Sequence, residues 1–357
     1  MTAGGGERAA SAETPYADLD PGVVLDALDA VGLRGDGRLL QLNSYENRVY
    51  QVFLEDGRAV VAKFYRPGRW SDAQILEEHA FARSLAAAEI PVAEPLGLER
   101  DAASPHAAHV ALLGPTLAEL RTPSGGVHRY GVTPRLGGRG PELDDPHVRQ
   151  RIGHAVGRMH AVGRQDAFRA RARIDVATTG RASRDWLLAH DVLPPDAAPR
   201  WRSLADRALE VCERAFVEAA AVDVRLHGDC HLGNVLWSGD GDASGPSFVD
   251  FDDCASGPAV QDLWMLLAGD RATRQRQLGD VLEGYEAFLE LDPRELALVE
   301  PLRTLRMLHH SAWIARRWHD PAFPIAFPWF ESPAYWSEQC TRLDEQLLAM
   351  AEPPLRW

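Results

Sequence analysis

Residues 226–237, LHGDCHLGNVLW, and residues 248–253, FVDFDD, constrain this chain more than any other stretch. In both, strand-forming apolar residues lie beside polar ones, and the segment between them is rich in Gly, Asp and Ser, as tight turns are. The pattern predicts a β-hairpin that brings Asp229, Asn234 and Asp250 toward one another. Mg²⁺ prefers such carboxylate and amide oxygens and completes its shell with water and phosphate oxygens. The stretch therefore indicates phosphoryl transfer.

The spacing of these polar residues matches the catalytic segment of kinases, in which an Asn follows the Asp of His-Arg-Asp by five positions and Asp-Phe-Gly comes later. Here His-Gly-Asp at 227–229 precedes Asn234 at that offset, and Asp-Phe-Asp at 250–252 lies where Asp-Phe-Gly would. In kinases the first Asp receives the proton of the acceptor hydroxyl, while the Asn and the second Asp bind metal. The order and spacing predict a kinase-like catalytic loop.

The first part of the chain predicts a small β-rich unit with two helices. Asp20 and Pro21 mark the start of a short helix. Ser71 and Gln74 have the spacing of a capping box for a longer helix that ends before Pro91. Three strand-like stretches between the helices predict an antiparallel meander, at residues 38–44, 47–54 and 58–65.

Lys63 lies on the third predicted strand, where kinases carry the lysine that binds the ATP phosphates. The next helix offers Glu77 and Glu78 as the glutamate that holds this lysine. The prediction favours Glu78 and leaves an error of one helical turn open.

The whole chain predicts an α+β, bilobed fold. Residues 1–15, rich in Gly and Ala, predict a disordered tail, and residues 16–132 predict an N-lobe with the antiparallel sheet and the pairing helix. Residues 133–357 predict a mostly helical C-lobe, which opens with a Pro- and Gly-rich connection as far as residue 146. Further strands are predicted at 109–113 and 127–132, and long amphipathic helices at 145–163 and 200–220.

Composition limits the classes of partner. A formal net charge of -14 argues against a nucleic-acid partner, which would require clustered Lys and Arg. The sequence contains neither an apolar signal segment nor a run near the roughly 20 residues that span a bilayer, so no membrane partner is expected. Four scattered cysteines without metal-binding spacing fit a reducing, cytoplasmic setting.

HGDCHLGNVLW together with FVDFDD resembles the aminoglycoside phosphotransferase and choline kinase-like family, in which Gly replaces the Arg of His-Arg-Asp and a second His follows the Asp. Within that family the chain is similar to bacterial stress response kinases, which are serine/threonine protein kinases. The blocks that carry this likeness lie between about residue 40 and residue 270: NSYENRVYQV, VAKFYRPGRWSDAQILEEH, GRMHAVG and GPAVQDLWMLLAGD.

The resemblance implies a role for each matching residue. Asp229 would be the catalytic base, Asn234 and Asp250 would bind Mg²⁺, and Lys63, paired with Glu78, would bind the ATP phosphates. The adenine of ATP would lie against the connection near residues 133–136, between the two lobes.

The loop NSYENRVY between the first two strands has no glycine, whereas ordinary kinases place a Gly-rich loop over the phosphates. Without glycine the backbone approaches a phosphate less freely. The resemblance therefore implies that Ser44 lies over the ATP phosphates and that the side chains of Ser44 and Asn47 do part of the binding. The family shares this departure.

Two alternatives to a protein kinase stay open at the level of sequence. One is a small-molecule kinase for an aminoglycoside, choline or another amino alcohol, because an acidic C-lobe would suit a cationic acceptor. The other is a nucleotide-binding regulator without turnover.

Several residues also have ordinary structural interpretations. His227 is expected to shape the loop, His231 to line the site without taking a proton, and Asp262 to brace the loop. Four tryptophans near the C-terminus are expected to anchor helices in the core: Trp313, Trp318, Trp329 and Trp336.

Overall fold

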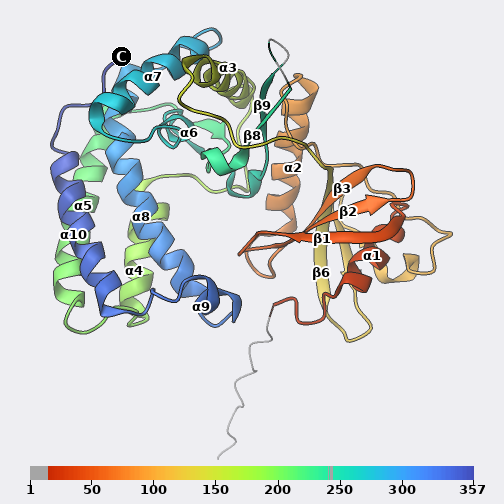
Figure 1. Ribbon diagram of the computed structural model, residues 1–357. Coiled ribbons are helices and arrows are strands. Elements are labelled where there is room, and N and C mark those ends of the chain that lie inside the picture. The colour runs from red at the N-terminus through yellow and green to blue at the C-terminus, as the bar shows by residue number, and fades with distance from the viewer. Residues whose placement is uncertain (1–14, 240, 242–243) are drawn as a thin grey trace, which may run out of the picture.

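The computed structural model describes residues 15–239, 241 and 244–357 (Figure 1). The predicted tail falls outside the described residues except for its last position, and the turn of the predicted hairpin falls partly outside them. A sheet region, residues 15–134, lies beside a mostly helical region, residues 146–357 (Figure 1). This arrangement confirms the predicted α+β class, with the β-rich part first in the chain. The boundary predicted at 132/133 falls inside the last strand of the sheet and stays a prediction.

The sheet region is built on a six-stranded antiparallel sheet with the strand order β1-β2-β3-β6-β5-β4. The first three strands are neighbours in space as in sequence, which confirms the predicted meander. The sequence prediction lacks β5, whose residues Ala-Glu-Leu-Arg favour helix and include no β-branched or aromatic residue. The strands are β1 Gly35–Leu42, β2 Arg48–Leu54, β3 Ala59–Phe64, β4 Val110–Leu112, β5 Ala118–Arg121 and β6 Val127–Pro134.

Helix α1, Pro21–Asp29, covers one face of this sheet. The Asp20 side chain accepts a hydrogen bond from the Val23 amide, as predicted for its N-cap. Apolar side chains of α1, among them Val24 and Leu28, join the core of the sheet.

Helix α2, Asp72–Ala87, connects the sheet to the helical region. Its predicted capping box is present, because Ser71 Oγ accepts from the Gln74 amide and Gln74 Oε1 accepts from the Ser71 amide. Near its start Ile75 packs with sheet-region residues, whereas Phe81 and Leu85 belong to the core of the helical region. A side chain on α2 can therefore reach the boundary between the two regions.

The helical region contains two short two-stranded ladders, β7 with β10 and β8 with β9. The second ladder is the predicted hairpin, with Val235 opposite Phe248. The helices and strands of the helical region are α3 Pro146–Gly163, α4 Ala182–Ala189, α5 Ala198–Ala219, β7 Val224–Leu226, β8 Val235–Ser238, β9 Gly245–Phe248, β10 Ala255–Gly257, α6 Gln261–Trp264, α7 Arg271–Tyr285, α8 Val299–Arg316, α9 Ala322–Ala326 and α10 Pro333–Ala349.

The ladders place the two polar sequence clusters side by side. The loop from β7 to β8 carries residues 227–234, and the loop from β9 to β10 carries residues 249–254. Because β7 pairs with β10 and β8 pairs with β9, each loop joins a strand of one ladder to a strand of the other, and the two loops run side by side.

The C-terminal tryptophans follow the prediction only in part. Trp336 lies buried in a core formed by α4, α5, α8 and α10, as expected. Trp329 is 43% exposed, so the prediction of a buried anchor is wrong at this position. Among the described residues, no helix is both long enough and apolar enough to cross a membrane.

Helices α3 and α7 approach each other so closely that glycine is required at the contact. A methyl group on Gly157 of α3 would lie 2.5 Å from the Tyr285 carbonyl oxygen of α7. Gly153 on α3 and Gly284 on α7 meet opposing backbone in the same way. Helix α3 also packs against β7 and β9, the strands that precede the two polar loops.

We expect Gly157→Ala to lower the free energy of unfolding by about 1–3 kcal/mol, because the added methyl group forces the two backbones apart. Gly279→Ala on α7 is the matched control: its methyl group would lie 4.0 Å from the Trp357 Cβ, its nearest neighbour. Without a clash, alanine should stabilise this helix by roughly 0.5–1 kcal/mol. Denaturant unfolding of both variants measures this contrast, and equal effects at the two positions would contradict it.

Candidate active site

Asp262 on α6 holds the loop that begins at His227. One carboxylate oxygen accepts from the His227 amide at 2.7 Å, and the other accepts from the Gly228 amide at 2.9 Å. The His160 Nε2 lies 3.1 Å from the same carboxylate, and all of these groups are buried. A carboxylate with several donors tolerates burial, so Asp262 fixes the loop backbone, as the sequence predicts.

Gly228 occupies the position where the kinase motif has arginine, and the backbone there requires glycine. Its φ of +84° lies in the left-handed region, and a Cβ would collide with the Asp253 carbonyl oxygen. The two polar loops are therefore in direct backbone contact at this point.

His227 shapes the same contact, as expected. Its Nε2 donates to the Val249 carbonyl over 2.9 Å, and its ring lies 4.5 Å from that of Phe251. The imidazole is buried and links the β7–β8 loop to the β9–β10 loop.

Asn234 and Asp250 are positioned by backbone bonds. The Asn234 carbonyl accepts from the Val249 amide at 3.1 Å, which brings Asn234 next to Asp250. The Asn234 Nδ2 donates to the Asp229 carbonyl over 3.0 Å, so the amide oxygen is the atom of this side chain that could bind a ligand. Asp250 has φ 61° and ψ 69°, a left-handed conformation that costs a non-glycine residue on the order of 1 kcal/mol or more. Strain of this kind is typical of functional positions.

Lys63 on β3 contacts carboxylates from both regions. Its Nζ lies 3.3 Å from Glu78 on α2, 3.2 Å from Asp250 and 2.9 Å from Asp252. Burial alone would lower the pKa of Lys63, but Asp252, Glu78 and Asp250 more than offset this and hold the pKa well above its usual value. The lysine is therefore a permanent cation.

The structure distinguishes the two candidate glutamates on α2. Glu78 is buried and contacts Lys63, and its pKa is raised by burial although Lys63 opposes the rise. Glu77 points elsewhere and accepts three backbone bonds, of 2.6, 2.8 and 2.8 Å, from residues 169–171. The pair formed with Lys63 is the one that the sequence favours.

Asp252 and Asp253 form ion pairs that the sequence motif does not reveal. Asp252 contacts both Lys63 and Arg69, and Arg69 also contacts Asp253 at 2.5 Å. Burial raises the pKa of Asp252, but the charges of Arg69 and Lys63 reverse this and hold the pKa well below its usual range. The Asp-Phe-Asp sequence is the only hint, because its last position is Gly in ordinary kinases.

Asp229 faces an arginine from a distant part of the chain. The Arg306 Nη1 on α8 lies 2.5 Å from Asp229 Oδ1, and the His231 Nε2 lies 3.4 Å from Oδ2. Burial raises the pKa of Asp229, but His231 and Arg306 outweigh this and hold the pKa well below its usual range. Arg306 belongs to no motif, so sequence reasoning could not find it.

The β1–β2 loop is anchored rather than open. Asn47 is 3% exposed, and its side-chain oxygen accepts from the Arg66 amide at 3.0 Å. The Ser44 Oγ accepts from the Asn47 amide at 3.3 Å and is half-buried. In this structure Asn47 therefore supports the loop, and a direct phosphate contact by Ser44 or Asn47 stays a prediction.

Glu46 ties this loop to the helical region, which the sequence did not predict. It accepts from the Trp313 Nε1 at 2.6 Å and lies 2.6 Å from the Arg317 Nε at the end of α8. Nearby, Arg66 pairs with Asp320 at 2.8 Å. The sheet region thus meets α8 at one side of the site and the polar loops at the other.

The residues present suit a divalent ion shared with phosphate. Among the described residues, no group of three His, Cys, Asp or Glu side chains could hold a metal by itself. Mg²⁺ is usually held by one or two protein oxygens with phosphates and water, and the Asn234 amide oxygen with the 56% exposed Asp250 carboxylate meets that requirement.

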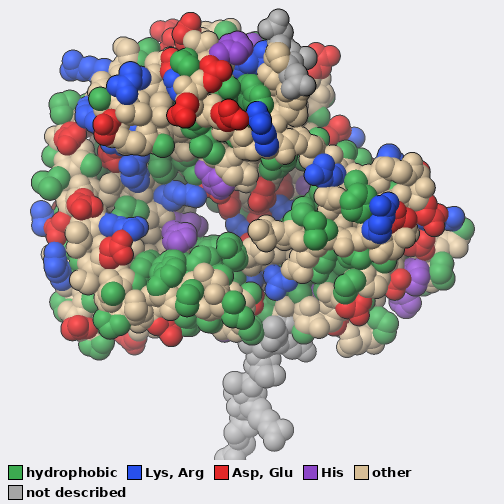
Figure 2. Space-filling model, viewed as in Figure 1, with side chains coloured by type: hydrophobic (Ala, Val, Ile, Leu, Met, Phe, Trp, Pro, Cys, Tyr) green, Lys and Arg blue, Asp and Glu red, His purple; other side chains and the backbone are tan. Residues whose placement is uncertain are grey.

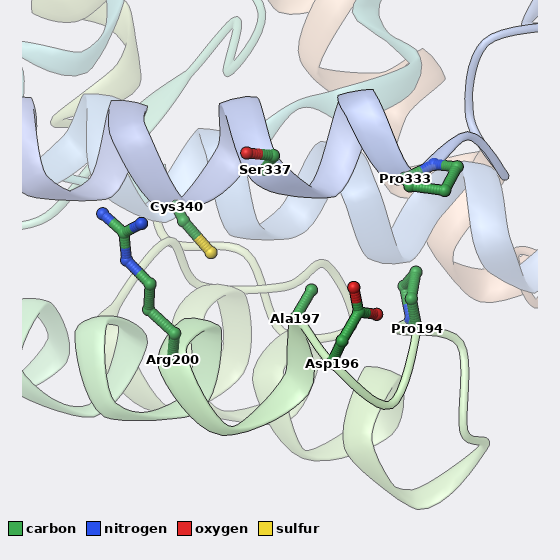
Figure 3. A pocket seen from close by; sticks show the side chains of 7 residues that line it. All are labelled: Pro194, Asp196, Ala197, Arg200, Pro333, Ser337 and Cys340. Atoms are coloured by element: carbon green, nitrogen blue, oxygen red, sulfur yellow. The ribbon is translucent and has the colours of Figure 1, made fainter.

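A pocket between the start of α5 and α10 is separate from this site (Figure 3). Figure 3 shows Asp196 and Arg200 extending from the α5 side toward α10, where Cys340 lies. The pocket shares no residue with the polar loops.

Comparison with known proteins gives consistent matches. The profile of the phosphotransferase enzyme family (APH) matches residues 38–299. Stress response kinase A of Salmonella choleraesuis (strain SC-B67) is 41% identical over 341 residues, which cover 96% of each protein. The serine/threonine protein kinase RdoA of Salmonella typhimurium (strain LT2) is also 41% identical over 341 residues and 96% of each protein.

The fold has a counterpart among solved structures. Amicoumacin kinase hAmiN, solved in complex with AMP-PNP, Ca²⁺ and Ami, superposes with a TM-score of 0.69 at 21% identity. The match covers 94% of this chain and 95% of that one. At this identity the likeness concerns the fold alone, and it agrees with the predicted bilobed, kinase-like architecture.

Proposed function

This chain belongs to the phosphotransferase enzyme family and, within it, to the stress response kinases, and on that premise we propose how its residues act. The reaction is transfer of the γ-phosphoryl group of ATP to a serine or threonine hydroxyl of a protein, with Mg²⁺ as cofactor. The protein acceptor is inferred from the relative named a serine/threonine protein kinase.

One chain of contacts carries the proposal: Lys63 contacts Asp250, the Val249 amide beside Asp250 donates to the Asn234 carbonyl, and Asn234 Nδ2 donates to the Asp229 carbonyl. Along this chain a cation, two candidate metal ligands and a candidate base are neighbours. Phosphoryl transfer requires little covalent chemistry from a protein, because catalysis comes from positioning and charge stabilisation. The cluster supplies both.

ATP would lie between the sheet region and the helical region, with its adenine against residues 133–136. Lys63 would then exchange its contact with Asp250 for an ATP phosphate, while Glu78 keeps the lysine in place. Ser44, in the anchored β1–β2 loop, is the residue of that loop we place nearest the phosphates. We propose that the protein is located in the cytoplasm, because the reaction requires ATP.

Asn234 and Asp250 would hold Mg²⁺ through side-chain oxygens. When bound, the ion would neutralise charge on the phosphates and orient them for in-line attack. The carboxylates around Lys63 hold its pKa well above the usual value, so the group opposite the ion is a cation.

Asp229 would orient the acceptor and receive its proton. The acceptor oxygen forms a bond to the γ-phosphorus while the bond from that phosphorus to the bridging oxygen breaks. ADP leaves with the bridging oxygen, and the acceptor proton passes to the Asp229 carboxylate. Because its pKa is held low, Asp229 is ionised and ready to accept a hydrogen bond at neutral pH.

Incubation with labelled ATP, Mg²⁺ and generic protein acceptors tests the proposed function. We expect Asp229→Asn to reduce transfer by at least about 10²-fold, the usual contribution of a positioned base, while nucleotide binding persists. Asp223→Asn is the control, because Asp223 pairs with Arg173 at the surface. Unchanged turnover in Asp229→Asn would refute the assigned base, and the absence of any labelled acceptor with the wild type would refute the kinase proposal.

Two neighbouring glutamates give a matched test of the Lys63 contact. Glu78→Gln removes the charge that holds Lys63 against α2, so we expect the KM for ATP to rise about tenfold, equivalent to ~1.4 kcal/mol. Glu77→Gln makes the same chemical change one residue away, on the side that faces residues 169–171, and should leave KM within about twofold. Steady-state kinetics at saturating acceptor measures both values. A larger effect of Glu77→Gln than of Glu78→Gln would contradict the assignment.

A further inference from the structure

The segment opposite Asp229 has the opposite charge from the rest of the chain. Residues 301–319 contain four arginines, three histidines and no Asp or Glu, in a chain whose formal net charge is -14. Most of this segment is helix α8, which ends at Arg316. The acidic character of the whole chain therefore does not describe this surface.

One face of α8 lines the opening between the two regions. Arg306, His310, Trp313 and Arg317 are spaced by four, three and four residues, so they share one side of the helix. Arg306 contacts Asp229 at one end of this row, and Arg317 contacts Glu46 at the other. Figure 2 shows Lys or Arg and His side chains on the helical side of the central opening.

Most basic side chains near the site are already neutralised. Arg317 pairs with Glu46, Arg66 with Asp320, Arg69 with Asp252 and Asp253, and Arg303 with Glu300. Arg306 differs, because its carboxylate partner is Asp229, the residue proposed to receive the proton of the acceptor hydroxyl. The Arg306 side chain is 44% exposed, so solvent reaches it although it pairs with Asp229.

An acceptor hydroxyl that approaches Asp229 Oδ1 therefore arrives where Arg306 already binds. Arg306 must then lose its ion partner or gain another from the acceptor. The guanidinium has five N–H donors in a planar fork, which suits a carboxylate or phosphate. A cationic acceptor would instead bring two positive groups together.

The distance dependence of electrostatic energy shows whether Arg306 or the net charge of the chain has the larger effect on an acceptor. Two unit charges 4 Å apart interact by about 4 kcal/mol at an effective dielectric constant of 20. Charges farther apart than about 8 Å are largely screened at physiological ionic strength. The carboxylates of the β9–β10 loop pair with Lys63 and Arg69, whereas Arg306 is the basic group in contact with Asp229 itself. The charge preferred beside the acceptor hydroxyl therefore depends on Arg306 and not on the distant acidic surface.

We propose that the acceptor hydroxyl is accompanied by an anionic group that Arg306 binds, so that the preferred acceptor is a serine or threonine flanked by acidic residues. This inference rests on the proposed kinase function and adds the chemical class of its acceptor. It runs against the alternative, open from sequence, of a cationic amino alcohol or aminoglycoside. Arg306 then acts in specificity, because it exchanges Asp229 for the anionic group as the acceptor binds.

The test uses three serine peptides of equal length, flanked by Glu, Gln or Lys, and ethanolamine as a cationic small acceptor. With Mg²⁺ and ATP, we expect wild-type kcat/KM to be about tenfold higher for the Glu peptide than for the Gln peptide, and lowest for the Lys peptide and ethanolamine. Arg306→Gln should reduce the Glu-to-Gln ratio to about one, and Arg306→Lys should keep part of it.

Arg316→Gln is the matched control. Arg316 lies on the same helix but stacks on Trp186 and bonds the Ala182 carbonyl, away from Asp229. This variant should keep the wild-type ratio. A ratio near one in the wild type, a preference for Lys or ethanolamine, or an equal loss of the ratio in Arg316→Gln and Arg306→Gln would overturn the inference. In the first two cases transfer still occurs, so the proposed function survives, whereas the absence of transfer to every acceptor refutes both.

Discussion

Lys63 is the cation on which the arrangement of the site depends. It lies on a strand of the sheet region, yet its ammonium group contacts carboxylates from α2 and from the β9–β10 loop of the helical region. Burying an ion costs several kcal/mol unless opposite charges and hydrogen bonds compensate. Because each partner comes from a different element, the compensation exists only when β3, α2 and the β9–β10 loop are assembled correctly. The positive charge of Lys63 therefore favours the correct packing of these three elements and also serves the chemistry of the site.

The surrounding charges explain why this cluster is suited to a divalent ion. Lys63, Arg69 and Arg171 face four carboxylates: Glu78, Asp250, Asp252 and Asp253. Asp250 is the most exposed of the four and adopts a left-handed backbone. A strained, exposed carboxylate that pairs with a lysine is the position from which a metal and a phosphate can displace that lysine. Glu46 links the β1–β2 loop to α8 and to Arg317 just after it, so this loop is tied to the helical region.

Sequence reasoning reached the residues whose roles depend on local spacing. The capping box at Ser71, the meander that carries Lys63 and the hairpin beside Asn234 are set by periodicity and turn residues over a few positions, and all three are present. Glu78 was favoured over Glu77 from its place on the helix that follows β3, and Asp262 was expected to brace the loop from its place in the helix after the hairpin. Arg306 and Glu46 could not be predicted, since their partners are 77 and 267 or more residues away and no periodic signal connects them. The strand β5 was missed because its residues favour helix, and the exposed Trp329 because aromatic residues favour burial without requiring it.

The account as a whole requires that Asn234 and Asp250 share one ion opposite Lys63. A crystal structure of the protein with Mn²⁺ or Mg²⁺ and a nonhydrolysable ATP analogue tests this most directly, because the anomalous signal of Mn²⁺ locates the ion. We expect side-chain oxygens of both residues at about 2.1 Å from the ion, and the Lys63 ammonium group on a phosphate oxygen. An ion bound elsewhere, or a lysine still paired with Asp250 in the presence of the nucleotide, would contradict the account.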